Sequence, residues 1–336
     1  MPIPAFIREQ PAALDRCMAA MQDFAGTWKP RAFDGIALVG TGSSYNALTV
    51  ARRRFVTARR GPVSLHQPDD FIAELADAAA NPLVIVLSQS GASATSIAAA
   101  HAAVLAGLPT LAITASFNSL LARAGADVLH LPVGPEPVGP KTKGFLGSMA
   151  VLLQIAELLG APAMQAMTGA ALASLIEPAR LAAAALVPSL SEVDQIIVAG
   201  RAANYGVALE ATLKITEMAG IPTSALPTEE LLHGRLHGMT ERSIALIIAD
   251  GESERTEARR ARDVMARRNC RIEVIERSSA LWPADSLPPS PWNALGLILP
   301  FQWLAVLLAE ACGLRPEAMR HGSLSPELAI KTDPQP

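Results

Sequence analysis

The chain has 336 residues, of which 50% are hydrophobic and 18% are charged, and its formal net charge is -3. This length suggests about two domains, each with a sizeable core. The slightly acidic balance and the presence of only four Trp and two Tyr give no reason to expect nucleic acid or an anionic membrane as a partner.

The N-terminal sequence and the cysteines favour a cytoplasmic protein. The start, MPIPAFIREQ, has neither a basic region nor a long apolar run, so we expect no signal peptide. The apolar stretches look far shorter than the ~20 residues that span a bilayer. Cys17, Cys270 and Cys312 are widely separated and form neither a metal-binding spacing nor a disulfide framework. We expect no membrane segment, no metal and no cofactor.

Helical and strand patterns alternate along the first half of the chain. The predicted elements are a helix over 5–25, a strand, Gly/Ser turn and helix over 35–55, a strand over 62–66, a short helix from 69, a strand over 82–87 followed by a helix, a strand over 109–114, a helix over 117–124 and a strand over 127–133. Two Ala/Leu-rich helices follow over 142–187, with a break at 188–191. This alternation predicts a parallel α/β sheet with right-handed crossovers.

Residues 82–107 form the most informative stretch, in which the apolar run PLVIVL leads into Ser88, Gln89, Ser90, Gly91 and Ser93. A run of this kind is typical of a parallel strand that is buried on both faces. Small hydroxyls, a glycine and a helix N-terminus at the end of such a strand make an anion site. The alternative is an ordinary strand-to-helix turn in which Ser93 only caps the helix.

The pattern of the first half recurs about 160 residues later. The segment from Ile36 matches that from Ile196, and VIVLSQSG at 84–91 matches IALIIADG at 244–251 with Gly91 on Gly251. A register sustained over several elements indicates two copies of one α/β domain. The second copy has lost the serines of the first, so we expect only the first copy to hold a phosphate.

The first strand of copy one ends in Thr41, Gly42, Ser43 and Ser44. In a doubly wound sheet this turn and the turn at Ser88 can face one crevice, which suits a phosphate monoester. A dinucleotide site is disfavoured, because Tyr45 replaces the third glycine of the G-x-G-x-x-G pattern.

Copy two carries charged groups at helical spacing. Glu210, Lys214 and Glu217 share one face of a helix, and the residues between them on that face are apolar, which favours a functional role for the three charges. The alternative is a solvated helix face with ordinary salt bridges. Gly234 places His233 in a turn, where proton transfer is a better assignment than a metal shared with His237. Lys331 near the C-terminus is either a solvated tail residue or an amine for a Schiff base.

Several motifs occur in the order seen in the isomerase half of glucosamine-6-phosphate synthase. They are GTGSSYNA, LSQSGASATS, PKTKGF, NYGVALEATLKITE, ELLHG and LAIKTD. The chain therefore resembles the double sugar-isomerase (SIS) family over nearly its full length. The resemblance implies two flavodoxin-like SIS domains, each a parallel sheet flanked by helices, at 1–187 with the phosphate site and 188–336 with the catalytic groups. It also implies a homodimer with a shared active site.

The resemblance also implies roles for single residues. Ser44, Ser88, Gln89, Ser90 and Ser93 match the sugar-phosphate cradle, to which the turn at Ser43 belongs, and Lys141 stands where the family has a serine near the sugar. Glu217 matches the base that moves a proton between C1 and C2, and Glu210 and Lys214 match its neighbours. His233 matches the ring-opening histidine from the partner subunit, and Lys331 matches the lysine that forms an imine with the open ketose.

The departures from the family pattern concern the sugar more than its phosphate. Ala92 stands where the synthase has Glu, and Arg235 replaces a proline after His-Gly. The chain starts directly with the sugar half, so we expect it not to take nitrogen from glutamine. The favoured function is a deaminase that converts glucosamine 6-phosphate to fructose 6-phosphate and ammonia. The alternatives are a fructosamine-phosphate deglycase, a ketose–aldose isomerase and a non-catalytic sugar-phosphate sensor.

Overall fold

The computed structural model describes residues 2–75, 80–190, 192–276, 287–322 and 324–332. Its contacts divide the chain into two compact units, each named here after its β-sheet. The N-sheet unit consists of Ala12–Glu136, Lys143–Met164 and Gly322–Pro336. The C-sheet unit consists of Met1–Pro11, Pro137–Thr142 and Gln165–His321. The predicted domain boundary after residue 187 is a single cut in the chain and stays a prediction.

The N-sheet unit contains five parallel strands in the order β2-β1-β3-β4-β5. They are β1 (Gly35–Val39), β2 (Val63–His66), β3 (Pro82–Leu87), β4 (Thr110–Thr114) and β5 (Asp127–His130). Every residue of β1 and β4 is buried, as their unbroken apolar sequences predict. The predicted α/β fold is therefore confirmed in this unit, with the strand order of flavodoxin-like sheets.

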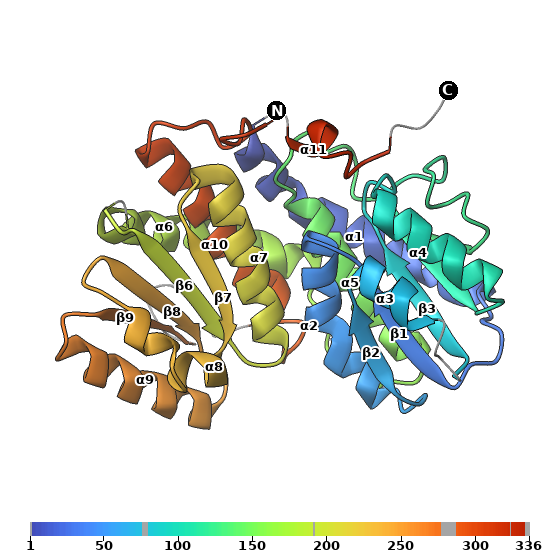
Figure 1. Ribbon diagram of the computed structural model, residues 1–336, viewed down its shortest axis with the longest axis horizontal. Helices are drawn as coiled ribbons and strands as arrows, with labels where there is room; N and C mark the ends of the chain where they lie inside the picture. The colour runs from blue at the N-terminus through green and yellow to red at the C-terminus, as the bar shows by residue number, and fades with distance from the viewer. Residues whose placement is uncertain (1, 76–79, 191, 277–286, 323, 333–336) are drawn as a thin grey trace. The chain divides into compact units, whose positions relative to one another are not determined.

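Helices cover both faces of this sheet (Figure 1). They are the greater part of α1 (Ile3–Thr27), α2 (Ser43–Thr57), α3 (Pro68–Leu75), α4 (Ala94–Leu105) and α5 (Lys143–Leu158), while the tail contributes α11 (Leu324–Glu327). Ala37 and Val39 of β1 pack into one cluster with Phe71 of α3 and Ala99 of α4. The alternating residues Ile36 and Leu38 are buried as well, so the strand is covered from both sides.

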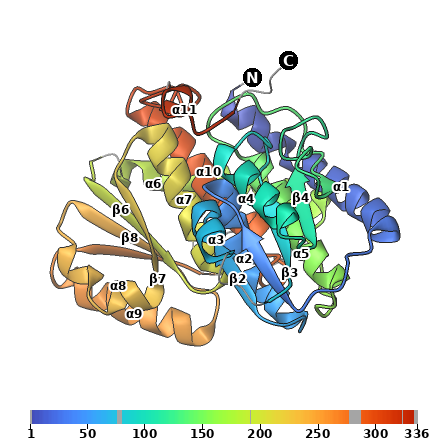
Figure 2. The ribbon, with the colours of Figure 1, turned by 45° about the vertical axis from the view of Figure 1, so that its right-hand side comes forward.

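The C-sheet unit repeats this arrangement with four parallel strands in the order β7-β6-β8-β9. They are β6 (Gln195–Gly200), β7 (Thr223–Pro227), β8 (Ser243–Ile248) and β9 (Arg271–Ile275). The helices are α6 (Gly169–Leu190), α7 (Ala203–Ala219), α8 (Thr228–Leu232), the 3-10 turn η1 (Arg235–Gly238), α9 (Glu252–Ala266) and α10 (Ala294–Ala311). Figure 2 shows this sheet with α9 beside it.

The strand register carries the repeat that the sequence predicts. Ile36 pairs with Val63 in β2, and Ile196 pairs with Thr223 in β7, so both partners shift by 160. However, Val39 pairs with Val86 while Ala199 pairs with Ile247, which makes the shift 161 at the next strand. The two sheets are therefore built alike, but the predicted equivalence of Gly91 and Gly251 is wrong. Gly251 is the N-cap of α9, as Ser93 is of α4.

Two local predictions are wrong. Residues 117–124 form turns instead of a helix, because the hydroxyls of Ser116 and Ser119 accept bonds from the backbone N–H groups of Asn118 and Ala122. The predicted break at 188–191 is also absent up to Leu190, because α6 continues through Pro178 and Pro188. Ser191 lies outside the described residues.

The apolar stretches are longer than expected. Gly169–Leu190 and Ala294–Ala311 are long and apolar enough to cross a bilayer by length and composition alone. In α10, 78% of the apolar window is buried inside the protein, as in the core helix of a water-soluble fold. α10 packs along much of its length against α7 and α6, so it is the central helix of the C-sheet unit.

Candidate functional site

Two hydroxyl-rich loops lie side by side at the carboxyl edge of the N-sheet. One follows β1 and the other follows β3, and these strands are paired in parallel from Gly35–Pro82 to Val39–Val86. In the order β2-β1-β3, the chain leaves β1 toward one side and returns as β3 on the other. This is the topological switch point, where open α/β sheets bind ligands. The predicted anion loops thus occupy the expected ligand position of this fold.

The β3–α4 loop is held in one shape around Gly91. Gly91 has φ +65°, and a Cβ there would lie 2.3 Å from Ser119 Oγ and 2.6 Å from Thr114 Oγ1. Its N–H donates to Ser88 O at 2.9 Å, and its carbonyl accepts from Leu121 N at 3.1 Å. A glycine is therefore needed both for the backbone conformation and for the close packing.

The predicted residues of this loop have different exposures. Ser88 is buried, Gln89 is half-buried and Ser90 is exposed. Ser93 is the N-cap of α4, and its hydroxyl oxygen accepts from Ser96 N at 3.5 Å and from Ser96 Oγ at 3.1 Å. Ser93 therefore does cap the helix, as the simpler interpretation held. Its role toward a phosphate stays a prediction.

The β1–α2 loop turns on Gly42, which has φ +56°. Ser43 and Ser44 are half-buried and form the first turn of α2, and Ser44 N donates to Thr41 O at 3.2 Å. Their position at the N-terminus of a long helix is one that favours anions.

The C-terminal tail lies against the β3–α4 loop. Lys331 and Ser93 form an antiparallel bridge, in which Ala94 N donates to Ile330 O at 3.3 Å and Thr332 N donates to Ala92 O at 2.9 Å. Lys331 is exposed and lies more than two hundred residues from Ser93 in the sequence. The structure thus brings the predicted tail lysine to the predicted phosphate loop.

A pocket of about 500 Å³ opens beside Gln89 and Ser90. Its other lining residues include Arg16, Ser116, His130 and Glu136, which sequence reasoning did not select. Arg16 donates to Pro132 O at 2.9 Å, and His130 Nε2 lies 3.1 Å from Ala115 O. Ser116 follows β4, His130 is the last residue of β5 and Glu136 follows β5, so the polar residues at the ends of those strands were the signal available in the sequence. Arg16 comes from α1 and carried no such signal.

Glu136 is buried and caps α5. Its carboxylate accepts from Lys143 N at 3.3 Å and from Gly144 N at 3.1 Å. An acidic residue before a helix start was the missed signal here. Lys143 is also buried, whereas the predicted Lys141 is half-buried in the segment just before the helix.

The C-sheet unit contains a buried charge cluster on α7. Lys214 Nζ donates to Glu217 Oε2 at 2.5 Å and lies 3.4 Å from Glu210 Oε1. The side chains of Glu210 and Lys214 are 0% and 1% exposed, and that of Glu217 is 24% exposed. The alternative of a solvated, salt-bridged face is therefore wrong, because packing covers all but the carboxylate end of this cluster.

Burial alone lowers the pKa of Lys214, but the charges of Glu210 and Glu217 and their hydrogen bonds outweigh it and raise the pKa above its ordinary value. Lys214 therefore stays cationic at neutral pH. A cation held in this way fixes the orientation of Glu217, whose carboxylate is the accessible member of the cluster.

His233 lies in the predicted turn, directly after α8. Its side chain is 74% exposed, and Nε2 lies 2.9 Å from Glu229 Oε1. It is remote from Glu217 within this unit. Thr216, next to Glu217, contacts Thr223 at the start of β7, whereas His233 follows the end of that strand.

The sheet also separates these two groups. Leu231 of α8 packs with Ala258 of α9 in one core cluster, whereas α7 packs against α10. The length of β7 adds about 13 Å between its start and the beginning of α8. One C-sheet unit therefore does not bring His233 and Glu217 together.

Comparison with known proteins assigns the family. The SIS domain model matches residues 34–158 and 189–279, which together make up more than half of the chain. The chain belongs to the SIS domain family.

Relatives of this SIS protein include sugar-phosphate enzymes. It is 27% identical to the glutamine–fructose-6-phosphate aminotransferase (isomerizing) of Lactococcus lactis, over 92% of this chain and 55% of that protein. The Halobacterium salinarum enzyme of the same name is also 27% identical, over 78% of this chain and 47% of that protein. The chain thus spans about half the length of the curated relatives it matches.

Solved structures share the SIS fold. The glucosamine-6-phosphate deaminase of Thermotoga maritima superposes with a TM-score of 0.75 at 18% identity, covering 93% of this chain and 98% of that one. The tagatose-6-phosphate ketose/aldose isomerase of Escherichia coli gives 0.70 at 17% identity, covering 99% and 94%. At these identities the likeness establishes the fold alone.

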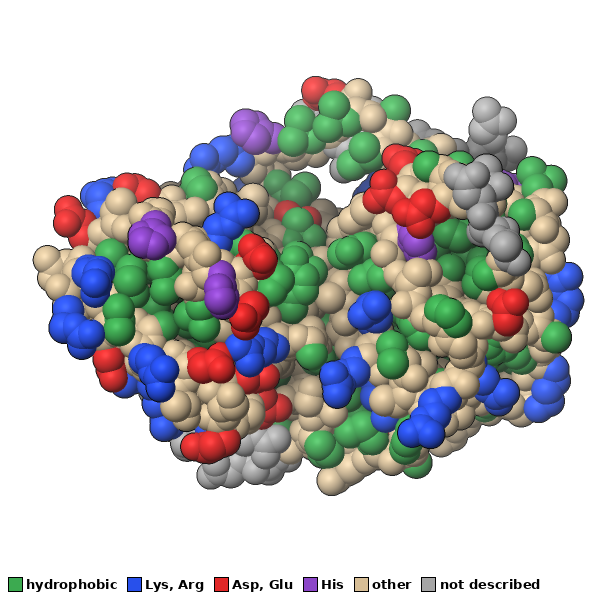
Figure 3. All heavy atoms as spheres, turned by 60° about the horizontal axis from the view of Figure 1, so that its bottom comes forward, with side chains coloured by type: hydrophobic (Ala, Val, Ile, Leu, Met, Phe, Trp, Pro, Cys, Tyr) green, Lys and Arg blue, Asp and Glu red, His purple; other side chains and the backbone are tan. Residues whose placement is uncertain are grey.

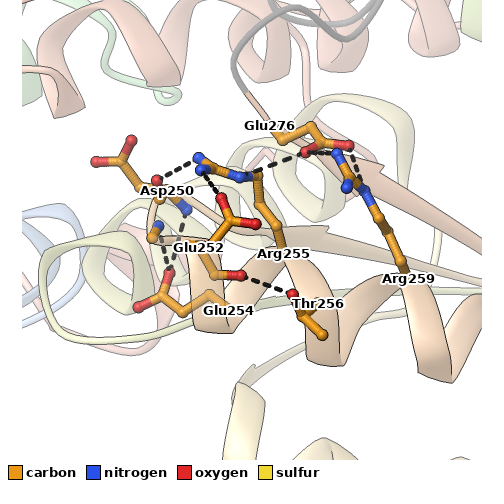
Figure 4. A network of polar contacts seen from close by, with 8 residues as sticks. Asp250, Glu252, Glu254, Arg255, Thr256, Arg259 and Glu276 are labelled. Atoms are coloured by element: carbon orange, nitrogen blue, oxygen red, sulfur yellow. Dashed lines mark hydrogen bonds and ion pairs between the residues drawn. The ribbon is translucent and has the colours of Figure 1, made fainter.

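In the second SIS segment, a side chain of the protein itself lies where the first segment has its candidate anion loop. The loop between β8 and α9 is Ala249–Gly251, shorter than Ser88–Ser93 between β3 and α4. Glu254 reaches back to accept from Asp250 N at 3.1 Å and from Gly251 N at 3.5 Å, as Figure 4 shows. The Glu254 carboxylate thus occupies the position at the N-terminus of α9 where a bound anion would otherwise lie.

Two arginines of this helix, Arg255 and Arg259, are also paired with carboxylates of the same unit. Arg255 donates to Glu252 Oε2 at 2.6 Å and to Asp250 O at 2.8 Å, and Arg259 donates to Glu276 at 2.6 and 3.1 Å (Figure 4). This network supports the prediction that only the first copy holds a phosphate.

The loop after β6 contains a strained residue. Ala202 has φ +49° and ψ -119°, and it stands 160 residues after Gly42, which has φ +56°. This region strongly favours glycine. We expect Ala202→Gly to raise the free energy of unfolding by about 1 kcal/mol, measured by urea denaturation. Ala173→Gly, at an exposed position of α6, is the matched control and should lower it by about 0.5–1 kcal/mol. A loss of stability in Ala202→Gly would contradict the strain argument.

Proposed function

We propose that this SIS protein is a cytoplasmic phosphosugar deaminase/isomerase that converts glucosamine 6-phosphate and water to fructose 6-phosphate and ammonia. The observation that carries the proposal is the bridge between Lys331 of the tail and Ser93 of the β3–α4 loop. This pairing gathers an amine, serine hydroxyls and a helix N-terminus at one edge of the N-sheet. An anion-binding loop with an adjacent amine suits a phosphorylated carbonyl sugar.

In this proposal the phosphate is bound by Ser44, Ser88, Gln89, Ser90 and Ser93. Glu217 moves the proton between C2 and C1, which needs a carboxylate near the sugar carbons whose orientation is fixed. The bond from Lys214 at 2.5 Å supplies that orientation. His233 donates and accepts the proton in ring opening, and Lys331 forms an imine with the open ketose. Lys141 and Glu210 assist binding.

The separation of His233 from Glu217 supports a homodimer with a shared active site. A histidine that is 74% exposed and remote from Glu217 in its own unit can serve the Glu217 of a second copy. In such a dimer each active site takes groups from both subunits. The partners of the protein are then a hexose phosphate and a second copy of the chain, without nucleic acid or membrane.

The reactions named for two structural neighbours are of the same type as the proposed one. One is a glucosamine-6-phosphate deaminase and the other a ketose/aldose isomerase of tagatose 6-phosphate. Both names describe reactions at C1 and C2 of a phosphorylated hexose. The second neighbour favours a ketose–aldose isomerase as the other candidate, and a fructosamine-phosphate deglycase uses the same proton transfer.

The test is incubation with glucosamine 6-phosphate and measurement of released ammonia and fructose 6-phosphate. Equal amounts of both products, lost in Ser88→Ala, are expected. Isomerisation of a keto or aldo hexose phosphate without ammonia would replace the deaminase by the isomerase. Release of an amino acid from a fructosamine phosphate would indicate the deglycase, and binding without turnover of any of these sugars would indicate a sensor.

A further inference from the structure

A second pocket lies in the N-sheet unit, at the edge opposite to the candidate phosphate loops. Its volume is about 430 Å³, and its lining includes Trp28, Lys29, Arg31, Phe33, Arg60 and Leu158. The loop that supplies its first residues runs from the end of α1 to the start of β1. Leu158 is the last residue of α5, and Arg60 lies in the turn that follows α2. The pocket is thus at the amino edge of the sheet and separate from the proposed active site.

The wall of this pocket is aromatic and aliphatic. Trp28 is buried, stacks on Phe24 with ring centroids 5.0 Å apart, and donates from Nε1 to Asp127 Oδ2 at 3.0 Å. Phe33 is half-buried, and Leu158 is exposed to 37%. Fixed apolar groups of this kind, in a cavity of this volume, are typical of sites for small organic molecules.

Three cations surround that wall. Lys29, Arg31 and Arg60 are exposed, and among the residues that the structure describes none of them forms an ion pair. The nearby carboxylates of Asp127 and Asp34 keep their charge but accept hydrogen bonds from the neutral groups Trp28 Nε1 and Asn81 N, the latter at 2.8 Å, instead of pairing with these cations. Three like charges around one cavity repel one another unless an anion lies between them.

The two arginines are anchored by backbone acceptors. Arg31 donates to Gly107 O at 3.0 Å, and Arg60 donates through Nε to Leu159 O at 2.8 Å. Arg60 follows Arg59 with φ +54° and precedes Gly61 with φ +98°, where a Cβ would lie 1.8 Å from Asp34 O. The loop that carries Arg60 is therefore fixed, and its remaining guanidinium N–H groups are available to a ligand.

The surrounding surface has the same character. Figure 3 brings the lower side of Figure 1 forward, and there the half that carries α2 and β1 shows Lys and Arg side chains among hydrophobic ones over its lower part, while a group of Asp and Glu side chains lies near its upper edge. Arg52 and Arg53 of α2 are exposed as well. A chain with a net charge of -3 thus keeps a locally positive surface around this pocket.

We propose that this pocket binds a phosphate monoester with an aromatic body, of the chemical class of a nucleoside monophosphate. The ring packs against Phe33 and Leu158, and the dianionic phosphate lies between Lys29, Arg31 and Arg60. The planar guanidinium groups of arginine match the geometry of phosphate oxygens. Three cations also suit the two negative charges of a phosphate monoester better than the single negative charge of a carboxylate. The site does not depend on the proposed reaction, because it shares no residue with the β3–α4 loop.

Calorimetric titration of the full-length protein tests this site. The probes are AMP, phenyl phosphate, inorganic phosphate and benzoate. Both aromatic phosphates should bind at least about tenfold more tightly than inorganic phosphate and benzoate, because only they supply ring and dianion together. Lys29→Gln, which removes no hydrogen bond or ion pair to another described residue, and Arg60→Gln should each weaken the binding of phenyl phosphate about tenfold.

Two variants serve as matched controls. Arg123→Gln removes an exposed cation elsewhere in this unit, and Ser90→Ala alters the candidate phosphate loop, so neither should change the affinity for phenyl phosphate. Absence of binding by both aromatic phosphates would overturn the proposal. So would benzoate binding as tightly as phenyl phosphate, or binding that Ser90→Ala abolishes and Lys29→Gln leaves intact.

Discussion

Replacement of Glu217 by glutamine is expected to lower the turnover of glucosamine 6-phosphate by about 10²–10⁴-fold, the usual contribution of a general base. Glutamine has the shape of glutamate, so its side-chain oxygen can still accept from Lys214 Nζ, which lies 2.5 Å from Glu217 Oε2. The variant loses the proton acceptor and keeps the fold. The measurement is the rate of ammonia release at saturating substrate, together with the melting temperature.

A subunit-mixing experiment separates this role from a merely structural one. Homogeneous Glu217→Gln and His233→Ala proteins should each be almost inactive. When the two are unfolded together and refolded, mixed dimers should regain activity, because one of their two sites receives both an intact Glu217 and an intact His233. Activity that does not recover in mixed dimers would contradict the shared site. Unchanged turnover in Glu217→Gln would contradict its role as the base.

Removal of the Lys214 charge is expected to have the largest effect on stability. Lys214→Met keeps most of the volume but leaves the buried Glu210, which is 0% exposed, without its counterion. Breaking a buried ion pair on one side costs about 3–5 kcal/mol. A loss of this size in the free energy of unfolding, measured by urea denaturation at pH 8, is the expected result.

The pH dependence follows from the direction of the pKa shift. Because the pKa of Lys214 is raised in the folded state, its contribution to stability is complete below the unfolded pKa and is lost only as pH rises through the folded pKa. The wild-type protein should therefore show no loss from this group between pH 6 and pH 9. In Lys214→Met the deficit should shrink at pH 5, because burial favours the neutral form of a carboxyl group.

The double variant Glu210→Gln/Lys214→Met is the matched control for this effect. It removes both charges of the buried pair, so it should recover much of the stability that Lys214→Met loses. A double variant as unstable as the single one would show that packing, not the uncompensated charge, accounts for the loss.

The sequence by itself determined the α/β fold and most of its strands. The apolar runs of β1, β3, β6 and β8 are buried on both faces, so they read as strands without any tertiary information. The 160-residue repeat also carried information that the strand patterns did not, since it makes Thr223, the start of β7, the equivalent of Val63 in β2. Serines and glycines directly after β1 and β3 marked the candidate anion loops, because strand ends in parallel sheets are ligand positions.

Only the tertiary structure decided how the candidate groups are placed. The burial of Lys214 depends on packing around α7, and the bridge between Lys331 and Ser93 joins segments far apart in the chain. Helix spacing alone allowed both a solvated and a buried charge cluster, and the tail sequence did not specify a partner. The separation of His233 from Glu217 likewise follows from their positions on opposite sides of one sheet. Local patterns fix local conformation, whereas burial and distant pairing depend on which surfaces the folded chain brings into contact.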